Sequence, residues 1–395
     1  MQLKGALSNI KVLDFTTLLP GPYATLMMAD MGAEVIKISS PSKVDLVLEK
    51  EPFFEDTEKS ANLLWLNRNK KTLALNLKKK EAINIVKELV KEADVLVEQF
   101  RPGVMKKLGL SYDDLKEINN KLIYCSISSY GQTGPMSKAA GHDINFLAKS
   151  GIMSLSGKTQ TGPVLINTQI GDLAIGANNA LIGILAALNY RNLTGEGQYI
   201  DIAMLDGLVS YNTFDGAAYL VDGELPERQN GMLNGGCAYD FYRTSDGRYI
   251  SVGSLEPKFW EEFCNAINRP EFIRKTVWPE DVRDVKDEIR KTIGSKTFGE
   301  WKEIFKDKDC CVEPVSNLRE ALDEDEQIKS RELVIEMPVG DKKVRQFAMP
   351  IKFSKSKAVY NHVGKNIGED TLNIIKELGY SEEDYKKLKE KDVFK

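Results

Sequence analysis

The chain is poor in several features that mark particular classes of protein. It has only two histidines in 395 residues, and its 54 Lys and Arg residues are outnumbered by 58 Asp and Glu residues. The formal net charge of −4 argues against nonspecific binding to nucleic acid or to an acidic membrane, because both require a basic excess. Two histidines are also too few for an ordinary His-based metal site, so we predict no metal.

Cysteines and long apolar runs are scarce as well. The five cysteines lack C-x-x-C spacing and lie in apolar stretches, which predicts reduced core residues: Cys125, Cys237, Cys264, Cys310 and Cys311. No stretch approaches the uninterrupted apolar length of a membrane span, and the N-terminus MQLKGALSNIKVLDF lacks the apolar core of a signal peptide. The C-terminus KEKDVFK carries no recognisable targeting tripeptide. We therefore expect a cytoplasmic protein that does not bind membranes.

The first half of the chain alternates short apolar runs with amphipathic segments. Strands are predicted at 9–15, 34–38, 72–77, 93–99 and 122–128, with helices at 24–31 and 80–92. Strand–helix–strand units of this length predict a parallel, Rossmann-like sheet flanked by helices, that is, an α/β domain. The first strand–helix turn has only Gly21 between two prolines, so the glycine fingerprint of dinucleotide binding is absent.

A second, smaller domain is expected after a polar, Gly- and Pro-rich linker at 222–236. The segment AYDFYRTSDGRYISVGS reads as a hairpin around a Ser-Asp-Gly turn, and helices are predicted at 258–267, 282–293 and 298–306. This pattern indicates a small α+β domain at 230–325. The large domain is then 1–225 plus 330–395, with a second linker at about 320–335 and two final helices at 370–378 and 382–390.

Basic residues gather near the ends of the predicted strands. Ligands of open α/β sheets bind near strand ends, where Arg and Lys can pair with phosphate oxygens. Each of these residues alone is more typical of a solvated surface charge, but together they predict a site for a phosphate-bearing cofactor: Lys37, Arg68, Lys70, Lys71 and Arg101.

His142 and Asp172 are candidates for acid–base chemistry. His142 lies in AGHDINFLAKSG, and Asp172 follows Gly171 at the start of a long apolar helix. A proton-transfer enzyme needs a base that can be neutral near pH 7 and a second group on the far side of the substrate. Asp143 and Glu256 could orient the imidazole. Alternatively, His142 is a core or capping residue and Asp172 is a helix N-cap.

Several motifs, in this order, resemble those of the family III CoA-transferase superfamily, and within it most of all the α-methylacyl-CoA racemases. The resemblance extends from Asn9 to about Pro314, and the motifs are NRNKKTLALNL, EQFRPGVMKKLGL, SSYGQTGP, AGHDINFLAKSG, Gly171-Asp172, TGEGQYIDIAMLDG, NGGCAYDFYRTSDGRYISVGSLEP and DCCVEPV.

The resemblance implies an interlocked homodimer whose large domain binds coenzyme A as part of an acyl-CoA substrate, without a prosthetic group. The active site would lie where large and small domains of different subunits meet. His142 and Asp172 would be the acid–base pair that inverts 2-methylacyl-CoA through an enolate, supported by Glu256 and Asp143, and Gly141 would join the CoA-binding positions. In the family's transferases the position of Asp172 is a nucleophile. The His in GHDIN favours the racemase, and a CoA-transferase remains the alternative.

Overall fold

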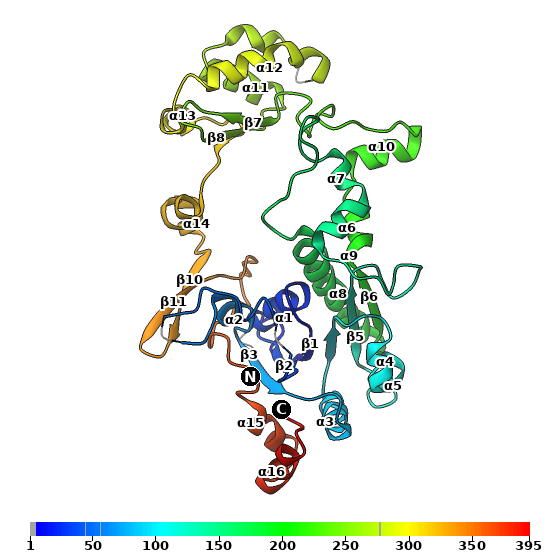
Figure 1. Ribbon diagram of the computed structural model, residues 1–395. Coiled ribbons are helices and arrows are strands. Elements are labelled where there is room, and N and C mark those ends of the chain that lie inside the picture. Colours follow the sequence, from blue (N-terminus) through cyan, green and yellow to red (C-terminus); the bar gives the residue numbers. More distant parts are fainter. Residues whose placement is uncertain (1–4, 44, 56, 276–277) are drawn as a thin grey trace. The chain divides into compact units, whose positions relative to one another are not determined.

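The structure is a computed structural model that describes residues 5–43, 45–55, 57–275 and 278–395. The chain forms two compact units (Figure 1). The first contains residues 1–147, 167–208 and 330–395, and the second contains 148–166 and 209–329. Residues 148–166 and 209–225, which we predicted in the large domain, thus belong to the second unit. Hydrogen bonds join these segments, for example from Asn212 Nδ2 to the carbonyl of Ser150 at 2.8 Å.

A six-stranded parallel sheet forms the centre of the first unit. Its strands are β1 (Lys11–Phe15), β2 (Glu34–Ser39), β3 (Lys70–Ala74), β4 (Val95–Glu98), β5 (Ile123–Ser128) and β6 (Tyr199–Ala203). The strand order β3-β2-β1-β4-β5-β6 is that of a Rossmann-like sheet, in which the winding direction reverses between β1 and β4. The predicted α/β fold is confirmed.

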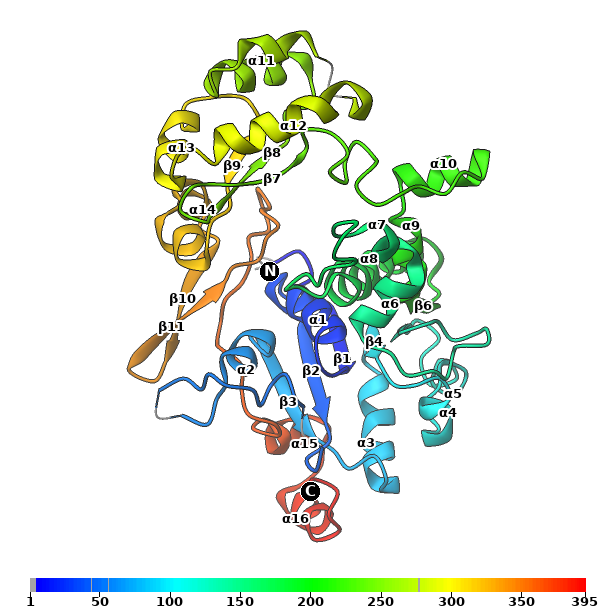
Figure 2. The ribbon, with the colours of Figure 1, turned by 45° about the horizontal axis from the view of Figure 1, so that its top comes forward.

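Helices cover both faces of this sheet, and strands β1 to β5 are buried on both sides. On one face, α1 (Pro20–Asp30) lies beside α8 (Asn178–Thr194), and both pack on a core that includes Val97 and Ile127 (Figures 1 and 2). On the other face, α3 (Lys80–Val90) contributes Ile85 and Leu89 to a core that α15 (Thr371–Glu377) also enters. The amphipathic spacing of α3 therefore matches its burial.

Shorter elements complete the first unit. They are α2 (Ala61–Leu66), α4 (Val104–Leu108), α5 (Tyr112–Lys116), α6 (Asp143–Ser150), α9 (Met204–Ser210), the hairpin β10 (Val334–Val339) and β11 (Lys342–Phe347), and α16 (Glu382–Glu390). A π-helical segment, η1 (Gly171–Ala177), leads directly into α8. Both α6 and α9 begin in the first unit and end in the second.

The second unit has an antiparallel sheet of β7 (Asp240–Arg243), β8 (Tyr249–Val252) and β9 (Val312–Pro314). The pairing of β7 with β8 confirms the predicted hairpin. Its helices are α7 (Ile152–Leu155), α10 (Phe214–Asp222), α11 (Pro257–Ala266), η2 (Pro270–Arg274), α12 (Pro279–Ile293), α13 (Phe298–Phe305), η3 (Glu320–Glu324) and α14 (Glu326–Ser330). Trp260, Phe263 and Trp301 lie in the buried core that joins this sheet to its helices.

Two expectations about apolar residues need correction. The continuous helix Gly171–Thr194 is long and apolar enough to cross a membrane by length and composition, although half of its most apolar window is buried in the protein. Its Ile184 and Leu188 belong to the core against the sheet, which accounts for that apolarity. Among the cysteines, Cys311 is exposed, whereas the other four are buried as predicted, and all five are free thiols.

A buried carboxylate, Asp14 of β1, connects the first three strands. Lys37 of β2 and Lys70 of β3 place their ammonium groups 3.3 and 3.2 Å from its two oxygens. The hydroxyls of Thr16 and Thr25 each donate to the same carboxylate at 2.6 Å. Burial alone would raise the pKa of Asp14, but the two lysines and the hydroxyl donors hold it well below its usual range.

A second buried ion pair connects distant segments of the first unit. The Arg68 guanidinium donates from Nε to Asp30 of α1 at 3.1 Å. From Nη1 it donates to Gln346 Oε1 at 2.9 Å and to the carbonyl of Phe347 at 3.0 Å. Since Gln346 and Phe347 lie in β11, this one side chain holds the C-terminal hairpin against the N-terminal part of the unit.

Arg68→Ala should therefore destabilise the first unit strongly. Removing one partner leaves the charge of Asp30 buried and unpaired, a loss that typically costs about 3–5 kcal/mol. The measurement is the shift of the urea unfolding midpoint. Lys71→Ala is the matched control, because Lys71 pairs with Glu34 and Glu377 at the surface and its loss should cost below about 1 kcal/mol. Equal shifts for the two variants would contradict a structural role for Arg68.

Candidate active site

A cavity of about 290 Å³ opens at the carboxyl edge of the parallel sheet. Residues that follow three of the strands line the cavity. They are Thr17 and Leu18 after β1, the segment Gln99–Pro102 after β4, and Ser128 and Ser129 at the end of β5. It therefore opens where the winding of the sheet reverses, between β1 and β4. Open α/β sheets bind their ligands at this place, because the loops on either side diverge and leave a crevice.

His142 and Asp172 both line this cavity. His142 lies directly before α6 and is exposed, and its backbone N–H donates to Asn145 Oδ1 at 3.0 Å. Gly141 also lines the cavity, and a Cβ at that position would come within 2.6 Å of the Tyr130 hydroxyl. The absence of a side chain at Gly141 thus allows the chain to pass close to Tyr130 just before His142.

Asp172 is the second residue of the π-helical segment η1. It does not cap the helix, since Ile170 occupies the N-cap position. Burial, and then the negative charge of Asp143, raise the pKa of Asp172 to about 6. Its carboxyl group can therefore exchange a proton near neutral pH, as acid–base catalysis requires.

Asp143 contacts the helix that carries Asp172. Its Oδ1 accepts hydrogen bonds from the backbone N–H groups of Gly171 at 2.6 Å and Asp172 at 3.1 Å. We predicted that Asp143 orients the imidazole of His142, but these bonds direct Oδ1 to the backbone at the start of η1. Sequence spacing could not reveal this contact, because the two segments meet only through the tertiary fold.

Glu256, the other predicted partner of His142, belongs to the second unit. It occupies the N-cap position of α11, and its side chain makes no capping hydrogen bond. The residues that the first unit itself brings together are therefore His142, Asp143 and Asp172.

The basic residues predicted to bind phosphate separate into two groups. Arg101 is exposed and lines the cavity. Lys37, Arg68 and Lys70 are instead buried in the ion pairs with Asp14 and Asp30. Lys71 lies at the amino end of β3, on the edge opposite the cavity, and pairs with Glu34 and Glu377. For these four residues the prediction is corrected, because their charged groups already pair with carboxylates within the fold.

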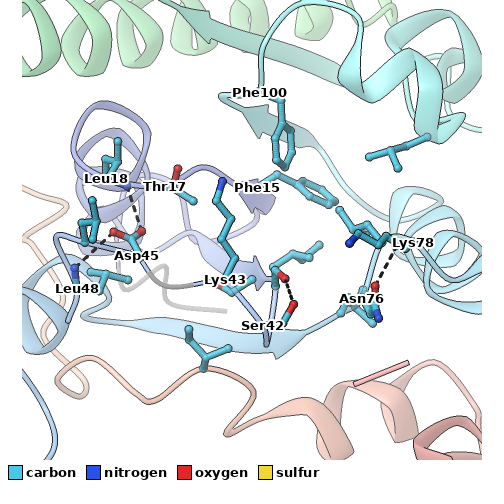
Figure 3. Close-up of a pocket in the computed structure, with 18 residues that line it drawn as sticks. Phe15, Thr17, Leu18, Ser42, Lys43, Asp45, Leu48, Asn76, Lys78 and Phe100 are labelled. Atoms are coloured by element: carbon cyan, nitrogen blue, oxygen red, sulfur yellow. Dashed lines mark hydrogen bonds between the residues drawn. The ribbon is translucent and has the colours of Figure 1, made fainter. Parts of the chain in front are cut away.

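A second cavity, of about 400 Å³, extends along the same edge over the ends of β1, β2 and β3 (Figure 3). It shares Thr17, Leu18 and Phe100 with the first cavity. Its apolar wall consists of Phe15, Leu18, Ile38, Leu46, Leu48, Leu75, Leu77, Phe100, Leu108 and Ile367. Its polar residues include Ser39, Ser40, Ser42, Lys43, Asn76 and Lys78. Figure 3 shows the Lys43 side chain extending into this cavity.

Lys43 and Lys78 were missed from the sequence. Both lie a few residues beyond the carboxyl ends of their strands, β2 and β3, whereas our prediction took lysines within or before those strands. A search restricted to the residues that follow the carboxyl end of each predicted strand would have identified both lysines as candidates. Within the part of the chain that the structure describes, no group of three or more His, Cys, Asp or Glu residues is arranged to hold a metal ion.

Comparison with known proteins identifies relatives along the whole chain. The alpha-methylacyl-CoA racemase of Homo sapiens is 33% identical, over 97% of this chain and 96% of that protein. The succinyl-CoA:glutarate CoA-transferase of Mus musculus is 34% identical, over 97% of this chain and 88% of that protein. The crystal structure of a CAIB/BAIF family protein from Brucella suis matches with a TM-score of 0.83 and 28% identity, over 95% of this chain and 100% of that one.

Relatives of nearly equal similarity therefore carry the names of two different reactions. What they share is the family itself. The model of CoA-transferase family III matches residues 7–371, nearly the whole chain. The chain belongs to CoA-transferase family III, a family of enzymes that act on CoA compounds.

Proposed function

We propose that this protein is an acyl-CoA racemase that interconverts (R)- and (S)-2-methylacyl-CoA thioesters. The observation that carries the proposal is that His142 and Asp172 line one cavity at the point where the winding of the sheet reverses. One residue removes the α-proton of the substrate, and the other returns a proton to the opposite face. The similarity to the human alpha-methylacyl-CoA racemase supports this reading.

The chemistry passes through an enolate of the thioester. Removal of the α-proton leaves its electron pair shared with the thioester carbonyl, which requires hydrogen-bond donors or a positive charge near the oxygen. Ser128, Ser129 and Arg101 line the same cavity and are of the required chemical type. A general acid and a general base in such a site each contribute roughly 100- to 10,000-fold to the rate.

The second cavity would hold the nucleotide part of coenzyme A. Its apolar wall suits the faces of an adenine ring, and Lys43 and Lys78 suit phosphate oxygens. The two cavities share Thr17, Leu18 and Phe100, so a single extended thioester could occupy both. The homodimer and the part of Glu256 in the site remain predictions.

A CoA-transferase is the alternative, and the raised pKa of Asp172 and the similarity to the mouse CoA-transferase give it weight. In that reaction the ionised Asp172 attacks the thioester carbonyl and expels CoA as a thiolate, which leaves a mixed anhydride. The thiolate then attacks the aspartyl carbonyl and releases the acyl group as a free carboxylate. The resulting aspartyl-CoA thioester passes CoA to the acceptor acid. His142 has no necessary part in these steps.

Isotope exchange separates the two reactions. Incubated with a 2-methylacyl-CoA in deuterated water and no free acid, the wild-type protein should epimerise the substrate and incorporate α-deuterium. His142→Ala should slow both by at least roughly 100-fold, because the pair loses one of its two proton carriers. His362→Ala, which removes the only other histidine of the chain, is the control and should keep the wild-type rate. Undiminished epimerisation in His142→Ala would contradict the assignment, and CoA transfer to an added acid without α-exchange would establish the alternative.

The pH profile gives an independent test. Both directions of racemisation require one proton on the pair, carried by Asp172 in one direction and by His142 in the other. The profile of kcat/KM should therefore be bell-shaped, with the rate falling at acid pH once both groups are protonated and at alkaline pH once neither is. A transferase needs only the ionised Asp172, so its rate should rise through about pH 6 and then stay level. A profile of that second shape would count against racemisation.

Binding of the nucleotide can be tested by shortening the substrate. Lys43→Ala and Lys78→Ala should each raise the KM for acyl-CoA roughly tenfold and leave kcat nearly unchanged, because a charge-assisted hydrogen bond to phosphate is lost in ground and transition state alike. The same variants should react normally with an acyl-pantetheine, which lacks the nucleotide. Lys71→Ala, whose charge lies on the opposite edge, is the control. An equal loss with both substrates would show that these lysines do not contact the nucleotide.

A further inference from the structure

Asp143 is connected to both proposed acid–base residues, His142 and Asp172. It follows His142 directly in the chain, and its Oδ1 accepts hydrogen bonds from the backbone of Gly171 and Asp172. The carboxylate of Asp143 thus connects the segment of His142 to the segment of Asp172, and both residues line the cavity. The proton transfers of the proposed reaction do not involve this contact directly. Its effect is therefore on the position of the backbone that carries Asp172.

The contact is built into the packing of the segment. The first N–H groups of a helix have no partner within the helix, and here two of them are satisfied by a side chain from another element. Gly171 is buried, and a Cβ on it would lie 2.9 Å from Asp143 Oδ1 and 3.1 Å from Leu208 Cδ1. A side chain at position 171 would therefore crowd the carboxylate where it accepts these hydrogen bonds.

We propose that Asp143 is a positioning residue for Asp172: its carboxylate fixes the first turn of η1 and so the direction in which Asp172 presents its carboxyl group to the cavity. This inference rests on the proposed function, because the orientation of Asp172 matters for catalysis only if Asp172 takes part in the reaction. The contact itself is independent of which reaction the enzyme performs.

The same contact places two carboxyl groups close together. Burial comes first and the charge of Asp143 second among the causes that raise the pKa of Asp172 to about 6. Arg101 and His142 line the same cavity as Asp172. The adjoining elements carry Lys149 in the last turn of α6 and Asp206 in the first turn of α9. Burial also raises the pKa of Asp143, although its two backbone hydrogen bonds act in the opposite direction. Asp143 thus has two separable effects on Asp172, one through hydrogen bonds and one through charge.

Two substitutions separate these effects. Asp143→Asn keeps an oxygen that can accept both backbone N–H groups but removes the charge, so kcat at the optimum should stay within about threefold of the wild type. The acid limb of the pH profile should move to lower pH, because the like charge beside Asp172 is gone. Asp143→Ala removes the acceptor as well, and kcat should fall roughly 100-fold with little change in KM, since the carboxyl group of Asp172 is no longer held in place. Asp113→Asn, at an exposed aspartate paired with Lys116, is the control and should leave kcat and profile unchanged.

A structural readout makes the test independent of activity. The amide resonances of Gly171 and Asp172 should titrate with a nearby carboxyl group in the wild type, and their hydrogen exchange should accelerate in Asp143→Ala but not in Asp143→Asn. The ¹³C resonance of the Asp172 carboxyl should titrate at lower pH in Asp143→Asn. If these shifts occur while the wild type does not epimerise its substrate, the proposed function fails and the positioning role stands. If both variants keep the wild-type exchange rates and pH profile, the positioning role is refuted.

Discussion

The buried carboxylate of Asp14 is the interaction on which the active edge of the sheet depends. Its bonds to Lys37 and Lys70 join β1, β2 and β3, and the Thr16 backbone N–H also donates to it at 2.9 Å. The chain leaves β1 at this point, so the network fixes the start of the loop whose Thr17 and Leu18 line both cavities. Burial lowers the pKa of Lys70 to about 8, yet the adjacent Asp14 favours its charged form. Charges of this kind are held inside the protein and are not available to a ligand.

The site is assembled from loops that rigid elements hold in place. Each strand end provides a few residues: Thr17 after β1, Arg101 after β4 and Lys43 after β2. The buried Glu98, at the end of β4, accepts the Phe100 N–H at 2.8 Å and the Ser126 hydroxyl, which fixes the start of the loop containing Arg101. Burial raises the pKa of Glu98 to about 7. Hydrogen bonds to buried carboxylates therefore shape two neighbouring loops of the crevice.

In the proposed reaction, Asp172 must meet two requirements that usually conflict. A carboxyl group that exchanges protons near neutral pH must be partly withdrawn from water, and it must still reach a substrate. Placement in the first turn of η1, beside Asp143 and at the cavity wall, meets both requirements. π-Helical turns are uncommon and often occur at functional sites, in keeping with this position. The long apolar α8 that follows anchors the turn, because Ala180, Leu181 and Ile184 are buried against the sheet.

The sequence by itself determined the α/β class and the hairpin of the second unit, because periodicity is a local property of the chain. Motif order is also local, and it directed attention to the segments around His142 and Asp172. It placed β3 at 72–77, whereas the strand is Lys70–Ala74, since the lysines that begin it look like a polar turn until their partners are known. Only the tertiary structure decided which charged residues line a cavity. Lys37 and Lys43 are both lysines in or just after the same strand, and the sequence does not distinguish their roles. In the structure Lys37 pairs with Asp14, whereas Lys43 lines a cavity. The partner of Asp143 was likewise decided by folding, because a hydrogen bond across 28 residues depends on where two helices meet.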